Sequence, residues 1–144
     1  MKNRLYEASG TCGRVSEDLV AVVMNGGVVM TLAGGDLPHV GAVALAEPRP
    51  SRTEKGKTSS TVSVLVRLGH KEDDLAKRLA GELAASLKVP VVLSAGIHID
   101  QASAKEIHEA ELLAGALVMD SVPKIRELLD EVLPRKRRPP RSPS

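Results

Sequence analysis

The chain has 144 residues, enough for one domain with its own core but too few for two. Its one tyrosine is its only aromatic residue, which argues against the stacking platforms on which single-stranded nucleic-acid binding relies. The net charge of +2 is misleading, because five of the 20 basic residues follow Pro134; residues 1–133 carry an excess of acidic side chains and no basic nucleic-acid face.

Several features predict a cytoplasmic protein. No apolar run approaches the roughly 18 to 20 residues that cross a bilayer, and the first residues lack the apolar stretch of a secretion signal. The lone cysteine, Cys12, has no partner for an intramolecular disulfide, which suits a reducing compartment. We expect residues 1–133 to form one ligand-binding domain, and residues 134–144, rich in proline, arginine and serine, to be a disordered basic tail.

The first half of the chain has the pattern of strands. Over residues 6–68, short β-branched and apolar runs alternate with Gly, Asn and Pro. Runs at 19–24 and 28–32 flank Asn25-Gly26, a pair that readily takes the positive φ angles of a tight hairpin turn. An antiparallel hairpin is therefore predicted here.

A second pair of strands is predicted on either side of a polar stretch. Small residues at 39–46 leave the backbone open to close approach, and apolar and polar side chains alternate at 61–68. Residues 47–60 hold two prolines, four cations and no large apolar residue, so they predict a long loop. Long loops inside compact domains are usually functional or disordered.

The second half of the chain changes to a helical period. Leucines recur every four residues from Leu75 to Leu87 and predict an amphipathic helix. Glu72, Asp73 and Asp74 fall in its first turn, where the helix dipole favours acidic side chains. An apolar run at 89–95 then predicts another strand.

Two further helices are predicted after that strand. A capping-box signature at Ser103 and Glu106 opens the first, which is expected to end near residue 114. The second is expected to begin near Ser121, with Pro123 in its first turn, where proline is tolerated. Together the elements predict an α+β fold, a two-layer sandwich of a mainly antiparallel or mixed sheet with helices on one face.

Three of the four histidines share one context, because each follows a glycine at the edge of an apolar segment. They are His39 after Gly35, His70 after Gly69, and His98 after Gly96. Such edges gather ligand-binding groups, and glycine lets a ligand approach the backbone. On an extended backbone His98 and Asp100 point to the same side, so both can serve a ligand site, unless Asp100 caps the next helix instead. His108 is expected on a helix surface.

The stretch 47–61 combines guanidinium and ammonium groups with serine and threonine hydroxyls, the side chains that hold a phosphate. It lacks the spacing of a P-loop, so an exposed mobile loop is the other interpretation. No pairing of nucleophile and base is legible, and no cysteine cluster or His-Glu-x-x-His motif is present. The residues therefore do not demand an enzyme.

Five motifs in order resemble the LpdD-like prenylated flavin chaperone family over about residues 6–115. They begin at Gly35, Pro48, Ser60, Gly69 and Ala95 and read GDLPHVGAVALA, PRPS, STVSV, GHKED and AGIHID. Members of this family are small proteins encoded beside UbiD-type decarboxylases. The resemblance does not extend to the basic tail.

The resemblance implies a non-catalytic carrier that binds reduced prenylated FMN, or FMN itself, and delivers it to an apo UbiD-type decarboxylase. A flavin prenyltransferase would be a second partner. On the matching motifs, the phosphate would be held by Arg49, Ser51, Ser60 and Thr61. The ring system would lie near His39, Gly69, His70, Lys71, Gly96, His98 and Asp100.

Two other functions stay open. A metal-dependent enzyme acting on a small molecule would use His39, His70, His98 and Asp100 as ligands or acid–base groups. A structural accessory subunit of a decarboxylase complex would co-purify with an enzyme and bind no ligand of its own. Small residues at 41–46 and an aliphatic surface would suit a homodimer, since twofold contacts are the commonest oligomer arrangement.

Overall fold

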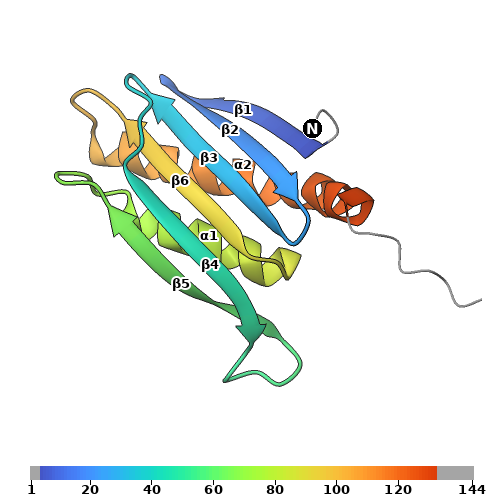
Figure 1. Cartoon of the computed structure of the whole chain (residues 1–144). Coiled ribbons are helices and arrows are strands. Elements are labelled where there is room, and N and C mark those ends of the chain that lie inside the picture. The colour runs from blue at the N-terminus through green and yellow to red at the C-terminus, as the bar shows by residue number, and fades with distance from the viewer. Residues whose placement is uncertain (1–3, 133–144) are drawn as a thin grey trace, which may run out of the picture.

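Residues 4–132 are described by the computed structural model, and they form one sheet with two helices packed on the same face (Figure 1). The predicted α+β sandwich is thereby confirmed, whereas the predicted tail, residues 134–144, lies outside the described residues. In chain order the elements are β1 (Leu5–Cys12), β2 (Val15–Met24), β3 (Gly27–Gly35), β4 (Ala42–Pro50), β5 (Thr58–Val66), α1 (Asp73–Leu87), β6 (Val91–His98) and α2 (Ala104–Val132).

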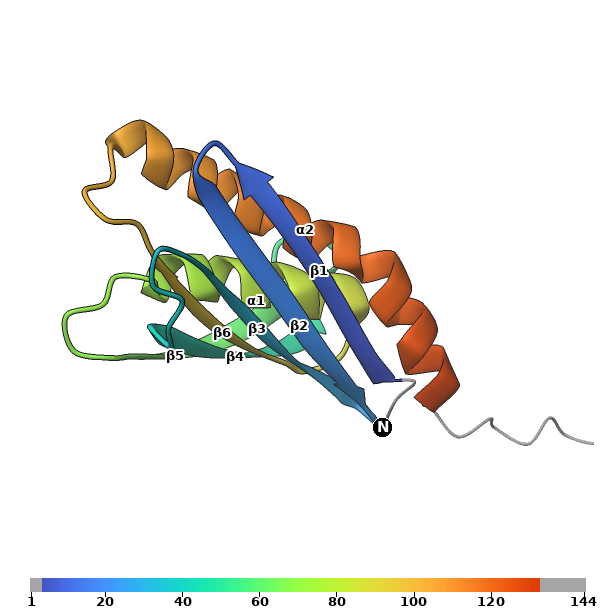
Figure 2. The ribbon, with the colours of Figure 1, turned by 90° about the horizontal axis from the view of Figure 1, so that it is seen from above.

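The six strands form a mixed sheet in the order β1-β2-β3-β6-β4-β5. Among the described strands only β3 and β6 are parallel neighbours; the other neighbours are antiparallel. The last strand, β6, therefore lies between a three-stranded meander and the β4–β5 hairpin. Helix α1 packs on β4, β5 and β6, and α2 packs on β1 and β2 (Figure 2).

The predicted β2–β3 hairpin is confirmed. Met24 pairs with Gly27, which leaves Asn25 and Gly26 as the two turn residues. Of these two, only Gly26 takes a positive φ, at 84°. Glycine carries that angle without the steric cost that a Cβ would bring.

The predicted long loop at 47–60 is wrong. Strand β4 continues to Pro50 and β5 begins at Thr58, so the connection is reduced to residues 51–57. The pairing of β4 with β6 ends at Ala46, so the rest of β4 is an edge that pairs only with β5. Prolines are tolerated at such an edge, which explains how Pro48 and Pro50 lie within a strand.

The prediction of two helices after β6 is also wrong, because α2 runs unbroken for 29 residues and contains Pro123. Its buried stripe runs from Ala110 to Leu129, and so continues on both sides of Pro123 and keeps the helix whole. Met119 and Pro123 lie on the exposed side, where water can reach the carbonyl that a proline leaves without its helical donor. No helix among residues 4–132 combines the length and apolar character that crossing a membrane requires.

The core between sheet and helices is aliphatic, as the composition requires. Its largest fully buried side chains include Leu19, Met30 and Leu79. One acidic residue interrupts it: Glu17 on β2 is 0% exposed, and neither carboxylate oxygen has a hydrogen-bond partner. Burial disfavours the charged form and raises the pKa of Glu17 to about 8.

Candidate functional site

A pocket of about 690 Å³ opens at the end of the sheet where β3, β5 and β6 stop and both helices begin. That volume is in the range of small-molecule and cofactor sites. Its apolar wall consists of Leu37, Leu75, Ile97, Ile99, Ala102, Ile107 and Ala110. The other lining residues are His39, Arg67, Gly69, His70, Lys71, Glu72, His98 and Glu111.

Two glycines allow the segment after β3 to cross the end of β6. A Cβ on Gly96 would lie 1.6 Å from the carbonyl oxygen of His39, and a Cβ on Gly35 would lie 2.0 Å from that of His98. The crossing is held by backbone hydrogen bonds from Asp36 N to His98 O (2.6 Å) and from His39 N to Gly96 O (3.3 Å). At Gly96, therefore, the space left by the missing side chain is filled by the backbone of His39.

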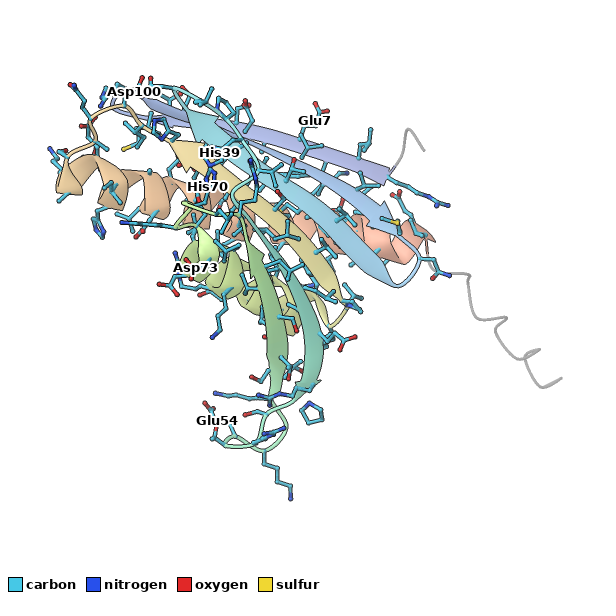
Figure 3. The ribbon with its side chains drawn as sticks, turned by 60° about the vertical axis from the view of Figure 1, so that its left-hand side comes forward. Glu7, His39, Glu54, His70, Asp73 and Asp100 are labelled. Atoms are coloured by element: carbon cyan, nitrogen blue, oxygen red, sulfur yellow. The ribbon has the colours of Figure 1, made fainter. Side chains whose placement is uncertain are left out.

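His39, His70 and Glu72 come together inside the pocket, and we call them the histidine cluster. His39 Nε2 lies 2.7 Å from Glu72 Oε1 and 3.0 Å from His70 Nδ1. The two imidazole rings are tilted by 40°, with centroids 4.7 Å apart (Figure 3). The side chains are mostly buried, with exposed fractions of 15% for His39, 27% for His70 and 14% for Glu72.

Glu72 is the member that sequence reasoning missed. It is the N-cap residue of α1, and the sequence suggested only that its negative charge is favoured by the helix dipole at this position. Its side chain makes no capping hydrogen bond and is directed to the two histidines instead. Its position two residues after His70 was the available signal.

His98 and Asp100 form a separate pair at the rim. His98 Nε2 lies 3.0 Å from Asp100 Oδ1, as their spacing predicted, and the side chains are 51% and 72% exposed. Asp100 does not cap α2. The predicted capping box does so, with Glu106 N donating to Ser103 Oγ and Ser103 N donating to Glu106 Oε1, both at 3.1 Å.

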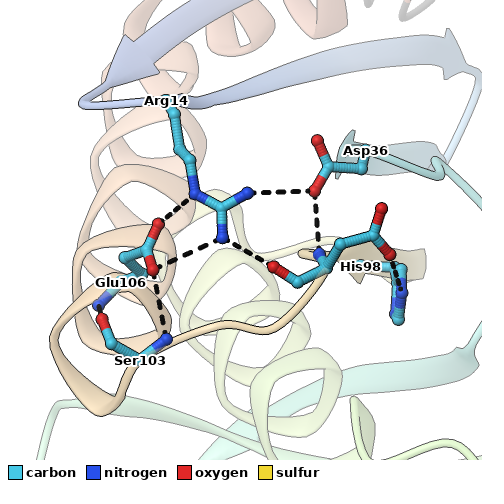
Figure 4. Close-up of polar contacts among 6 residues, drawn as sticks. Arg14, Asp36, His98, Ser103 and Glu106 are labelled. Carbon is cyan, nitrogen blue, oxygen red and sulfur yellow. Dashed lines mark hydrogen bonds and ion pairs between the residues drawn. The ribbon is translucent and has the colours of Figure 1, made fainter.

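An arginine from the opposite end of the sequence fixes the loop before α2 (Figure 4). Arg14, in the β1–β2 turn, donates to Glu106 and, at 2.6 Å, to the carbonyl oxygen of Asp100. Asp36 Oδ2 accepts from Arg14 Nη1 at 3.3 Å and from Asp100 N at 2.8 Å. The hydrogen bond from Arg14 is the main cause that lowers the pKa of Glu106 to about 2. This network holds the loop that supplies Ile99 to the pocket.

Two cationic residues, Arg67 and Lys71, also line the pocket. Arg67 Nη1 donates to the carbonyl oxygen of Val40 at 2.9 Å, which orients its guanidinium group beside the segment that carries His39. Lys71 is exposed and lies between His70 and Glu72 in the sequence. His108 is exposed on α2, where the sequence placed it.

The structure does not bring the four predicted phosphate residues to this pocket. Arg49 Nε donates to Thr61 Oγ1 at 2.9 Å on the β4–β5 hairpin, and Ser51 Oγ accepts from Glu54 N at 3.1 Å in its turn. Figure 3 shows Glu54 at the end of this hairpin remote from His39 and His70. Ser60 lies beneath α1, with its Oγ 3.0 Å from the Cβ position of Gly81.

The model of the prenylated flavin chaperone LpdD-like domain matches residues 11–126. Nothing among the curated proteins matches the chain. Among solved structures, one similar chain belongs to the crystal structure of a chaperone complex for yeast 20S proteasome assembly. That chain is 15% identical, with 91% of this chain and 99% of the other covered and a TM-score of 0.42.

Proposed function

Because the chain belongs to the prenylated flavin chaperone LpdD-like family, we propose that it is a non-catalytic carrier whose pocket binds reduced prenylated FMN. One observation carries this proposal: every residue that lines the pocket lies within the matched segment, residues 11–126. The family likeness and this pocket thus involve the same part of the protein.

The apolar wall suits the ring system of such a ligand. Leu37, Ile97 and Ile99 come from the ends of strands, and Ile107 from the first turn of α2, so aliphatic side chains face the pocket from several elements. Apolar contact of this kind can bury an isoalloxazine with a fused prenyl-derived ring without aromatic stacking. FMN, which lacks the prenyl-derived ring, would leave part of this wall uncovered.

The polar lining divides into two groups with different roles in the proposal. Lys71 and Arg67 are the cations of the pocket, and we assign them to the ligand phosphate in place of the hairpin residues. His39, His70 and His98 would meet the polar edge of the ring system. Asp100, bonded to His98, would orient that imidazole.

Delivery to an apo UbiD-type decarboxylase is the second part of the proposal. The rim is open, because His98 and Asp100 are 51% and 72% exposed, so a ligand can enter and leave without unfolding of the core. A flavin prenyltransferase would supply the cargo and the decarboxylase would receive it. Incubation of the loaded protein with apo-decarboxylase should restore decarboxylation, and an unrestored enzyme would contradict delivery.

Lys71→Ala should weaken binding of reduced prenylated FMN roughly 10- to 100-fold, because a charge-assisted hydrogen bond contributes about 1.5 to 3 kcal/mol. Arg49→Ala, a charge removed at the far end of the hairpin, should leave the Kd unchanged. Anaerobic titration followed by flavin absorbance measures both. The reverse pattern would assign the phosphate to the hairpin, and absence of binding to the unmodified protein would refute the carrier proposal.

A homodimer is the partner arrangement that we propose for this chain. The helices cover one face of the sheet, and the other face carries apolar side chains, with Leu45 44% exposed and Leu65 79% exposed. A second copy packed there would bury both leucines. Sedimentation equilibrium should give twice the chain mass, and Leu65→Glu should give the monomer; a monomeric unmodified protein would refute this arrangement.

A further inference from the structure

Three potential metal-ligand atoms converge in the histidine cluster. His39 Nε2, His70 Nδ1 and the Glu72 carboxylate oxygens all lie within 4.8 Å of one another. The separations are 2.7 Å for His39 and Glu72, 3.0 Å for the two ring nitrogens, and 3.8 Å for His70 and Glu72. The atoms come from two loops and a helix cap, so their meeting is a product of the tertiary fold.

The polar contacts of His39 indicate that a positive centre belongs between its ring and the Glu72 carboxylate. His39 Nδ1 lies 2.9 Å from the carbonyl oxygen of Leu37, which can only accept, so Nδ1 carries a hydrogen. In a neutral ring Nε2 then holds a lone pair, yet it lies 2.7 Å from a carboxylate oxygen of Glu72. Two acceptors at that distance require a positive centre between them. A proton on Nε2 meets this need, and a metal ion can replace the proton.

The separations are close to those of a bound metal. Zinc–nitrogen and zinc–oxygen bonds of about 2.0 to 2.2 Å place neighbouring tetrahedral ligands roughly 3.3 Å apart. His39 Nε2 lies 2.7 Å from Glu72 Oε1 and 3.0 Å from His70 Nδ1, and His70 Nδ1 lies 3.8 Å from the other Glu72 oxygen, Oε2, so small side-chain rotations bring one atom of each residue to this spacing. All three side chains already line the pocket, so none has to leave the hydrophobic core to bind the ion.

Neighbouring groups orient the ligands as they do in protein metal sites. The carbonyl of Leu37 fixes the His39 tautomer that presents Nε2, and Lys71 N donates to Glu72 Oε2 at 3.1 Å. The His39 backbone is tied to Gly96 and the Glu72 backbone begins α1. Both ligands are therefore held by elements that have no need to rearrange when an ion binds.

We propose that His39, His70 and Glu72 bind one divalent transition-metal ion, of which zinc is the best fit. Imidazole ligands suit zinc, iron, copper and nickel, whereas magnesium and calcium prefer oxygen ligands only. Three protein ligands leave at least one coordination position, which faces the pocket and takes water or an anionic group of a ligand. His98 and Asp100, paired with each other at the rim, are not part of this site.

Metal binding to the flavin-free, full-length chain tests this site separately from the carrier function. Chelator-treated protein without an affinity tag is titrated with zinc chloride by calorimetry, and with cobalt(II) by visible absorbance. We expect one ion per chain, d–d bands of a four- or five-coordinate cobalt ion, and proton release that makes the heat depend on the buffer.

Variants identify the ligands. His70→Ala and Glu72→Gln should each weaken zinc binding at least 100-fold, and Glu72→Gln keeps the side-chain volume so that folding, checked by circular dichroism, is preserved. His108→Ala, an exposed histidine on α2, and Cys12→Ser should bind like the unmodified chain. Failure to bind one ion, or unchanged binding by folded Glu72→Gln and His70→Ala, would overturn the proposal.

Discussion

Replacing Ala102 with tryptophan should weaken binding of reduced prenylated FMN, with an increase in Kd of roughly 10- to 100-fold. Ala102 lies in the loop before α2 and lines the pocket. An indole at this position occupies the space that the ring system needs, and overpacking of this kind costs about 1 to 3 kcal/mol even where neighbours can adjust. Anaerobic absorbance titration gives the Kd. The new indole also provides a fluorescence signal in a chain that has no tryptophan.

The control places the same side chain on α2, away from the pocket. Ala116 is exposed in α2 and does not line the pocket, so Ala116→Trp should bind the flavin like the unmodified protein. Unchanged affinity in a folded Ala102→Trp variant would show that the flavin binds outside this pocket. Equal loss in both variants would show that the effect is not steric.

The second large effect concerns the buried carboxyl of Glu17. Its pKa is raised to about 8 in the folded chain from a usual value of 4.5. Between these two pH values the folded state keeps a proton that the unfolded state has lost, so the free energy of unfolding falls as the pH rises. The total loss across the window is up to about 5 kcal/mol, from 1.36 kcal/mol per pKa unit.

Glu17→Gln should remove this pH dependence. The amide keeps the shape of the side chain and cannot ionise, so the variant should match the unmodified protein at pH 5 and be more stable by several kcal/mol at pH 9. Urea denaturation at both values measures the difference. Asp18→Asn, at the exposed neighbouring position, should follow the unmodified protein. Parallel pH profiles for Glu17→Gln and the unmodified chain would contradict the assignment.

Much of the fold could be predicted because local signals and packing agree. The Asn-Gly turn, the leucine period of α1 and the capping box of α2 each correspond to an observed feature. The errors occurred where a local signal was outweighed by packing. Prolines and cations at 47–60 suggested a loop, yet β5 supplies a pairing partner for that segment. Pro123 suggested a helix start, yet the apolar stripe on both sides of it keeps α2 continuous.

The candidate site, too, could be predicted only in part from the sequence. The glycine context led to His39, His70 and His98, which all line the pocket. The meeting of Glu72 with His39, and that of Arg14 with Asp100, are contacts between distant segments, which one sequence does not reveal. Arg49 lies away from the histidines for a reason of length. A nine-residue strand spans roughly 27 Å, so the turn end of the β4–β5 hairpin is far from the end of β5 that meets the pocket.

The pocket draws its walls from the ends of three strands and the starts of two helices, and the Arg14 network joins it to the β1–β2 turn. Separation of any one of these elements from the rest destroys the cavity, so the proposed carrier function requires the fully folded chain. If the pocket binds the flavin as we propose, a ligand at 100 times its Kd adds about 2.7 kcal/mol to the free energy of unfolding by mass action. On that proposal the empty protein is the form most exposed to proteases and aggregation, and its lifetime depends on the supply of the ligand.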